Sequence, residues 1–451
     1  MKFFSYLSLF IASSWLIPEI ALASGAHSDP VAPVLIGLVV LFLAAKVGGI
    51  IATRLNQPAV LGELIFGVIL GNLGIVGYGG LNFIAQSEIF SIFAGVGVVL
   101  LLFEVGLESS VEELLSVGAV ATVVAIVGVV FPFILGLGAS FYFQPEKSIY
   151  VHSFVGATLC ATSVGITARV FKDLGKIQIK EAKIILGAAV IDDVLGLIIL
   201  AVISGIIASV GSGAGQEAVS IASVAMIAFK AVGFLVLSIF IGGRIAPQLF
   251  RWGGRLHTEG MLLALSLSFC FFLAWLANLV GLAPIVGAFA AGLIIDEAGF
   301  PRFFGKSETS IEHLIFPISN FFVPVFFVHM GMQVDLMTFA DTSVIIFGVT
   351  LSFMAILGKQ ACGLGVFGKD NKSVNRVLIG IGMIPRGEVG LIFAVIGAGL
   401  SINGQPVIDK PLYSAIVLMV MITTMITPPG LKWSLNKSRA QKSGSPQRVR
   451  S

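Results

Sequence analysis

The stretch VLGELIFGVIL (60–70) has a counterpart in IVGAFAAGLII (285–295), at an offset of 225 residues (285 − 60). Both stretches carry glycine at their third and eighth positions. Two further pairs of segments match at the same offset: EVGLE (104–108) with HMGMQ (329–333), and TSVGIT (162–167) with GEVGLI (387–392). With 53 glycines in the chain, one match would mean little. One gapless offset across three pairs of apolar segments indicates an internal structural repeat.

The composition places this repeat in a membrane. Of 451 residues, 57% are hydrophobic and 11% are charged, whereas charged residues make up about 25% of a soluble protein. Apolar runs near the roughly 20 residues that span hydrocarbon as a helix recur along the chain. We therefore expect an all-α polytopic membrane protein in a lipid bilayer. The formal net charge of +3 gives no reason to expect nucleic acid as a partner.

The sequence predicts about thirteen transmembrane helices. They cover 31–53, 58–76, 89–107, 117–143, 151–171, 181–209, 221–247, 259–280, 282–297, 313–332, 342–365, 376–400 and 411–429. Six form a first repeat (about 31–209) and six a second (about 256–430), with 221–247 as the linker helix between them. Because an odd number of crossings separates the repeats, the second repeat is inserted upside down. Inverted repeats are typical of carriers that work by alternating access.

The two ends of the chain carry targeting and orientation signals. Lys2, an apolar stretch and a small-residue pattern ending at Ala23 predict a signal peptide over 1–23. The transmembrane domain then covers 24–430. The remaining segment, 431–451, carries several Lys and Arg residues and no acid, so the positive-inside rule predicts a basic cytoplasmic tail.

Two of the expected helices are interrupted at corresponding positions of the two repeats. GATLCATSVGITARVF (156–171) contains Thr162 and Ser163 between glycines, and its counterpart GMIPRGEVGLIF (382–393) contains a proline between glycines. An alternative for the first segment is that its hydroxyls bond back to their own helix. Paired interruptions of this kind are the best sequence indication of a carrier's binding site, because freed carbonyls and half-helix dipoles can hold an ion.

Two groups of charged residues lie inside apolar spans. Asp192 and Asp193 stand in AAVIDDVLGLIIL (188–200) and have no acidic counterpart 225 residues further on. Since an unpaired charge costs roughly 2.5 to 3.5 kcal/mol in the middle of a span, we expect Lys359 to neutralise one of them. The alternative is that Lys359 extends toward the membrane surface and the acids brace helices. Adjacent residues on a helix point about 100° apart, so the two carboxylates are expected to serve different partners.

Arg386 and Glu388 lie in the second interrupted helix. The sequence leaves two interpretations open for them. They form an internal ion pair that supports the break, or they take part in coupling the movement of protons and ions.

Four segments resemble the monovalent cation:proton antiporter-2 family, in particular its sodium/proton branch, and point to a bacterial, cyanobacterial-type member. They are QPAVLGELIFGVILG (57–71), GATLCATSVGITARVF (156–171), the IDD of 191–193, and Lys359 with IPRGEVGLI (384–392). The resemblance covers nearly the whole chain after the predicted signal peptide. It implies the sodium/proton antiporter fold, a homodimer, and transport without enzymatic chemistry or a cofactor.

The same resemblance implies roles for individual residues. Asp193 is expected to bind Na⁺ and the proton in competition, Asp192 to pair with Lys359, and Thr162 and Ser163 to help ligate the ion. Release of a proton from Lys359 would make the exchange electrogenic. The transported ions are then Na⁺ and H⁺, with Li⁺ and K⁺ as further candidates, across the plasma membrane or a thylakoid membrane.

Two other functions fit parts of the sequence. The first is a K⁺/H⁺ antiporter or K⁺ efflux protein of the same family, although such proteins usually carry a large nucleotide-binding domain after the helices. The second is an intramembrane aspartyl protease. That enzyme needs two carboxylates that face each other from separate helices, which adjacent positions such as Asp192 and Asp193 do not provide.

Overall fold

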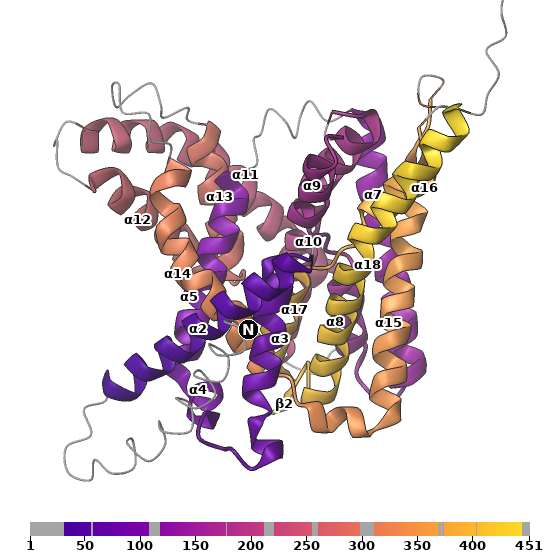
Figure 1. Cartoon of the computed structure of the whole chain (residues 1–451). Helices are drawn as coiled ribbons and strands as arrows, with labels where there is room; N and C mark the ends of the chain where they lie inside the picture. Colours follow the sequence, from indigo (N-terminus) through magenta and orange to yellow (C-terminus); the bar gives the residue numbers. More distant parts are fainter. Residues whose placement is uncertain are drawn as a thin grey trace, which may run out of the picture. The chain divides into compact units, whose positions relative to one another are not determined.

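The computed structural model describes residues 31–55, 57–107, 118–176, 178–211, 221–254, 260–297, 311–368, 371, 374–402 and 404–443. The predicted signal peptide and the last residues of the predicted tail lie outside these ranges. The helices of the first half are α2 (Val31–Arg54), α3 (Ala59–Gly71), η1 (Leu73–Val76), α4 (Asn82–Gln86), α5 (Glu88–Leu107), α7 (Ala119–Phe143), α8 (Ile149–Thr158), α9 (Val164–Asp173) and α10 (Lys180–Gly211) (Figure 1).

Helix α11 (Ile221–Gly254) follows. The second half contains α12 (Met261–Leu279), α13 (Pro284–Glu297), α14 (Ile311–Met332), η3 (Leu336–Ala340), α15 (Thr342–Gln360), η4 (Ala361–Gly365), α16 (Arg376–Gly382), α17 (Glu388–Gly399) and α18 (Lys410–Ser443). Two short antiparallel strands, β1 (Ser401–Ile402) and β2 (Gln405–Pro406), form a hairpin before α18.

The observed helices follow the predicted ranges closely. In the described part of the chain, nine helices are long and apolar enough to cross a membrane, and α3, α13 and α17 are shorter apolar helices. The predicted spans 151–171 and 376–400 are each divided into two helices. Helix α18 continues to Ser443, beyond the predicted end at 429, and α4 was not predicted.

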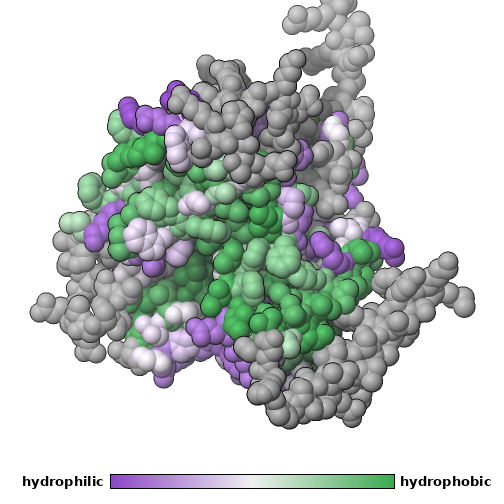
Figure 2. Space-filling model, turned by 90° about the vertical axis from the view of Figure 1, so that its left-hand side faces the viewer, coloured by the Kyte–Doolittle hydropathy of each residue, from purple (hydrophilic) through white to green (hydrophobic). Residues whose placement is uncertain are grey.

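Large apolar side chains cover much of the described surface. Helix α11 exposes Phe229, Val236 and Phe240, and α12 exposes Phe272 and Trp275. Figure 2 shows broad hydrophobic areas on this side of the molecule. Exposed apolar surface of this extent is unfavourable in water and suits contact with lipid hydrocarbon.

The chain divides into two compact units. The first contains the chain up to Gly97 together with Phe321–Asp335, and the second contains Val98–Asn320 and the chain from Leu336 on. The core of the first unit joins α2 and α3 to parts of α5 and α14. Its fully buried members include Leu41, Ala44, Ala45, Ile84, Val325 and Val328.

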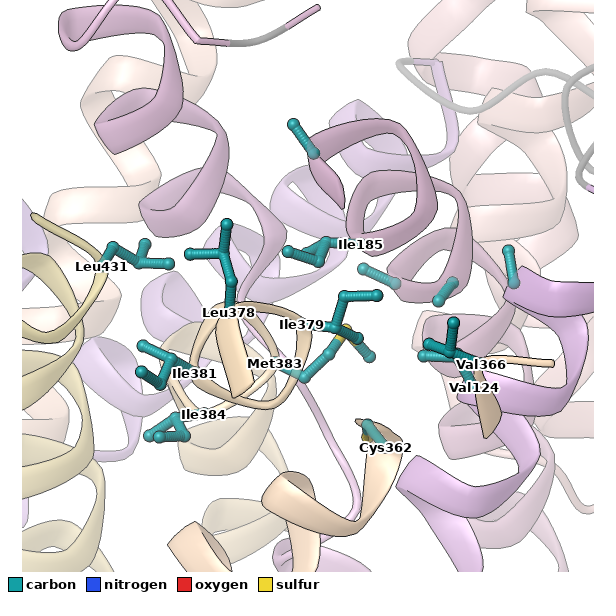
Figure 3. Close-up of a cluster of buried hydrophobic side chains, with 14 of the residues drawn as sticks. Val124, Ile185, Cys362, Val366, Leu378, Ile379, Ile381, Met383, Ile384 and Leu431 are labelled. Carbon is teal, nitrogen blue, oxygen red and sulfur yellow. The ribbon is translucent and has the colours of Figure 1, made fainter. Parts of the chain in front are cut away.

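The second unit contains the interrupted helices. One of its apolar clusters packs α7, α10, α16, η4 and α18 together, with Val124, Ile185, Cys362, Ile379, Met383 and Leu431 among its members. Figure 3 shows these side chains gathered around α16. Helices α15 and α18 lie side by side in this unit (Figure 1). The cluster fixes the end of α16, where the second interruption begins.

The predicted repeat is visible in how glycines pack between neighbouring helices. A Cβ atom on Gly62 of α3 would overlap the carbonyl oxygen of Gly48 in α2, and a Cβ atom on Gly287 of α13 would overlap that of Leu273 in α12. Both residues of the second contact follow those of the first by 225 positions. The two helix pairs therefore pack at the same close distance through equivalent residues.

A second contact repeats in the same way. A Cβ atom on Gly67 would overlap the carbonyl oxygen of Val328 in α14, and one on Gly292 would overlap that of Phe103 in α5. Here the glycine of one repeat meets the carbonyl of the other repeat, in both directions, at the offset of 225. Gly62, Gly67, Gly287 and Gly292 are thus positions where the backbones of two helices touch.

Helix α15, which carries Lys359, begins with a side-chain cap. Asp341 is exposed, and its carboxylate accepts a hydrogen bond from the backbone N–H of Ser343 at 2.9 Å. This hydrogen bond to the ionised form lowers the pKa of the Asp341 carboxyl. The cap satisfies one of the N–H groups that the first turn of a helix leaves unpaired.

Candidate functional site

Both interrupted helices open at corresponding places in the two repeats. Helix α8 ends at Thr158 and α9 begins at Val164; α16 ends at Gly382 and α17 begins at Glu388. The second break follows from its sequence, because Pro385 has no backbone N–H to donate. The structure thereby confirms that neither segment is a continuous helix.

The two breaks lie against each other. The backbone N–H of Ser163 donates a hydrogen bond to the carbonyl of Pro385 at 2.8 Å, and the Thr167 hydroxyl donates to the carbonyl of Gly382 at 2.7 Å. A Cβ atom on Gly387 would stand 2.7 Å from Ser163 Oγ, so only glycine allows this approach. The Ser163 backbone N–H and the Thr167 hydroxyl therefore hold the second break, whereas Thr158 bonds back to its own helix at Val155.

In the second break, each carbonyl from Gly382 to Arg386 has a donor. The donors are Thr167 for Gly382, Arg386 and Thr162 for Met383, Arg386 for Ile384, the Ser163 N–H for Pro385, and Thr424 for Arg386. The Thr162 contact is the longest of these, at 3.5 Å. The backbone carbonyls of the second break are thus hydrogen-bonded by groups of the protein itself.

The first break differs in this respect. No described residue donates a hydrogen bond to the carbonyl of Cys160, Ala161 or Thr162. All three residues are buried. Buried carbonyls without a donor cost free energy unless a cation, water or another group satisfies them. Among the described residues, the carbonyls of the second break all have donors and these three carbonyls of the first break have none.

Asp192 and Lys359 form an ion pair beside the breaks. Lys359 Nζ lies 2.9 Å from Asp192 Oδ1 and 3.1 Å from Oδ2, and neither side chain is exposed. The charge of Arg386 acts on the Asp192 carboxylate as well. The two residues that the sequence suggested as partners are thus in contact, from α10 and α15.

The room for this ion pair comes from a residue that the sequence did not single out. A Cβ atom on Gly128 of α7 would stand 2.8 Å from Cys362 Sγ, 3.3 Å from Lys359 Nζ and 3.7 Å from Asp192 Oδ1. Four residues later, Pro132 lies inside α7 and cannot donate to the Gly128 carbonyl. The sequence does contain a signal for this position, namely a glycine followed four residues later by a proline inside a long apolar helix.

Asp193 follows Asp192 on α10 and is partly buried. Successive helical residues point about 100° apart, so its carboxylate does not share the direction of the Asp192 carboxylate. Arg386 is fully buried, and its guanidinium donates to backbone carbonyls. The side chain of Glu388 lies outside the described residues, and its pairing with Arg386 stays a prediction.

Comparison with known proteins adds three findings. Residues 38–437 match the family described as "Sodium/hydrogen exchanger, transmembrane". The high-affinity Na(+)/H(+) antiporter NhaS3 of Synechocystis is 38% identical, over 92% of this chain and 94% of that protein. The Na(+)/H(+)-K(+) antiporter GerN of Bacillus cereus is 36% identical, over 90% of this chain and 97% of that protein.

The fold is similar to that of a solved structure. The sodium proton antiporter MjNhaP1 of Methanocaldococcus jannaschii superimposes with a TM-score of 0.66, covering 90% of this chain and 98% of that one. At 16% sequence identity, this likeness concerns the architecture and not individual side chains.

Proposed function

The chain belongs to the sodium/hydrogen exchanger family, and from that premise we propose that it is a secondary active antiporter that exchanges Na⁺ for H⁺. The observation that carries the proposal is the fully buried Asp192–Lys359 pair at the crossing of two broken helices, with Asp193 as its neighbour on α10. Intramembrane charges are costly, and they usually mark the path of an ion or proton. The names of the relatives NhaS3 and GerN, both Na⁺/H⁺ antiporters, support the same choice of ions.

In this proposal, Na⁺ is the transported substrate and Asp193 is its carboxylate ligand. The carbonyls of Cys160 and Ala161 and the hydroxyls of Thr162 and Ser163 offer further oxygens at the first break. A set of carboxylate, carbonyl and hydroxyl oxygens suits a hard cation such as Na⁺ or Li⁺. The satisfied carbonyls of the second break take no part in ligation.

Charge balance explains why one carboxylate can serve both ions. Among the described ionised side chains at the site, Asp192 and Asp193 contribute two negative charges, and Lys359 and Arg386 contribute two positive charges. Binding of either Na⁺ or H⁺ at Asp193 adds the same single positive charge. The protein can therefore carry either ion across the low-dielectric core at a similar electrostatic cost, and competition for Asp193 produces the exchange.

Lys359 has a second role in the proposal. While it is protonated, it neutralises Asp192 and keeps that carboxylate from taking up a cation. If Lys359 releases its proton when the pair separates, one transport cycle moves unequal charge in the two directions. Exchange is then electrogenic.

The wider organisation is proposed on the same basis. Residues 24–430 form the antiporter domain, with 1–23 as a signal peptide and the basic residues after 430 on the cytoplasmic side. Two copies form a homodimer in the plasma membrane or a thylakoid membrane, where exchange supports pH and salt homeostasis. Alternating access follows from the repeated halves, each with its own broken helix.

A K⁺/H⁺ antiporter is the second candidate. Its support is the name of GerN, which includes K⁺ beside Na⁺. The aspartyl protease is not supported, because Asp192 is ion-paired with Lys359 and because the family is one of transporters.

The test is proton flux in everted membrane vesicles that contain a pH-sensitive dye, with Na⁺, Li⁺ or K⁺ added in turn. We expect Na⁺ to release protons with the wild-type protein and not with D193N. The matched control is D341N, which makes the same replacement at the exposed helix cap. Full exchange by a folded D193N protein would refute the role of Asp193, and a response to K⁺ alone would select the second candidate.

A further inference from the structure

The two breaks correspond in sequence but are filled differently. In the second break, the Arg386 guanidinium donates hydrogen bonds to the carbonyls of Met383 at 3.2 Å and Ile384 at 2.8 Å. It also reaches the carbonyl of Ala355 in α15 at 3.5 Å. Three backbone carbonyls from two elements thus surround one positive charge. This is the environment that a bound cation would have at an interrupted membrane helix.

The first break has no such group. The residue that corresponds to Arg386 there is Ala161 (386 − 225), whose side chain is a methyl group. The carbonyls around it have no donor among the described residues. One break therefore holds a covalently attached cation, whereas no described side chain supplies a cation to the carbonyls of the other.

We propose that Arg386 is a tethered cation that permanently occupies the second break as a cation site, so that the first break alone takes an exchangeable ion. The inference rests on the proposed function for the identity of that ion. Its structural content, a guanidinium-binding site formed by backbone carbonyls, stands independently. In this inference, the Arg386 guanidinium occupies the place that a mobile cation would otherwise take.

The surroundings of Arg386 hold the charge in place. The side chain is completely buried, and its own carbonyl accepts a hydrogen bond from the Thr424 hydroxyl at 2.8 Å. Its Nε has no hydrogen-bond partner among the described residues. The guanidinium is thus held by the carbonyls at its NH1 and NH2 ends and by the field of Asp192, as a monatomic cation would be.

The proposal has a consequence for transport. Because Arg386 cannot leave, its charge is present in every state of the cycle and adds to that of Lys359 beside Asp192. The second break then contributes a constant positive electrostatic potential and does not bind or release an ion during the cycle. The number of transported cations per chain is limited to the one held at the first break.

The proposal is tested by removing the tether and supplying a free guanidinium. In R386A, the second break should bind methylguanidinium, because the carbonyl cage remains while its occupant is gone. We expect millimolar methylguanidinium chloride to raise the melting temperature of purified R386A, since a ligand of the folded state stabilises it. It should not affect the wild type, where the site is filled, nor T424V, which loses the neighbouring hydrogen bond but keeps the guanidinium. Tetramethylammonium chloride, whose cation has no N–H group to donate to the carbonyls, controls for ionic strength.

The same variants are measured for exchange in vesicles. R386A should lose about tenfold or more of the wild-type rate, as expected for loss of charge-assisted hydrogen bonds, and methylguanidinium should restore part of it. R386K, which keeps a cation, should retain more activity than R386A. The melting measurement does not depend on exchange. It therefore still tests the binding of a cation at the second break if the antiporter proposal fails.

Two results would overturn the inference. One is a folded R386A protein whose melting temperature and exchange rate do not respond to methylguanidinium. The other applies if R386A cannot be obtained folded, even when it is produced with methylguanidinium present. In that case R386K decides: an R386K protein that also fails to fold shows that the shape of the arginine matters and not its charge.

Discussion

Asp192 Oδ1 and Lys359 Nζ lie 2.9 Å apart with neither side chain exposed, although the residues are 167 positions apart in sequence. The contact joins α10 of the first repeat to α15 of the second. Because the charges are buried and mutually neutralising, each depends on the other to remain ionised inside the membrane.

Removal of one partner should destabilise the protein more than removal of both. D192L or K359M alone leaves an uncompensated buried charge, which typically costs about 3–5 kcal/mol. The double variant D192L/K359M replaces the pair by apolar groups and should recover much of the loss. Melting temperatures of the purified proteins in detergent test this order. Equal stability of the wild type and both single variants would contradict the buried ion pair.

Gly128 should be intolerant of any side chain. In G128A, the new Cβ atom would lie 2.8 Å from Cys362 Sγ and 3.3 Å from Lys359 Nζ, which forces the ion pair to shift. We expect a loss of stability of about 1–3 kcal/mol, as for other overpacked sites, and a reduced exchange rate. Gly138 of the same helix has open space around it, so G138A is the matched control and should be neutral or stabilising.

Thr167 should stabilise the crossing of the two breaks through its hydroxyl. T167V keeps the shape but leaves the buried Gly382 carbonyl without its 2.7 Å hydrogen bond, at a cost of about 1–3 kcal/mol. T350V removes a similar hydrogen bond on the exposed face of α15 and should cost much less. Thermal melting of both variants gives the comparison, and equal shifts would show that the crossing does not depend on Thr167.

The cap of α15 should give the protein a small pH dependence. The pKa of Asp341 is lowered in the folded state from the ordinary value of 3.8 because its ionised form accepts the Ser343 hydrogen bond. The cap therefore stabilises the fold above pH 3.8, and this contribution decreases as pH falls through the lower, folded-state pKa. D341N keeps the capping geometry without a charge. The difference in melting temperature between D341N and the wild type should thus change between pH 6 and pH 3; a constant difference would rule out this linkage.

Much of the architecture could be predicted because its causes are local. Apolar runs gave the helix positions, and Pro385 with its neighbouring glycines predicted the second break. The Asp192–Lys359 contact, although distant in sequence, could be inferred because a buried charge requires a partner. In each case the free-energy cost that determines the structure can be recognised from the residue types alone.

Other features depended on distances that the sequence does not contain. The importance of Gly128 comes from Cys362, Lys359 and Asp192 lying opposite it; Pro132, four residues later, marks the place in the sequence but does not reveal these neighbours. An ion pair with Glu388 was one of two interpretations of Arg386 and stays a prediction. The carbonyl contacts of Arg386 were not foreseen, because they arise where the break turns the backbone of Met383 and Ile384 toward it. The end of α18 was placed too early because its basic residues resemble a loop, whereas the helix continues through Lys432.

The repeated glycine contacts also restrict how the helices can move. Gly62 and Gly287 bring helix backbones into direct contact in the α2–α3 and α12–α13 pairs. Sliding one helix along its neighbour would drive a side chain into a carbonyl within one turn. Shear inside these pairs is therefore blocked, and each pair has to move as a rigid body. Conformational change in this protein is left to segments without such contacts, where the backbone is already released from helical hydrogen bonding.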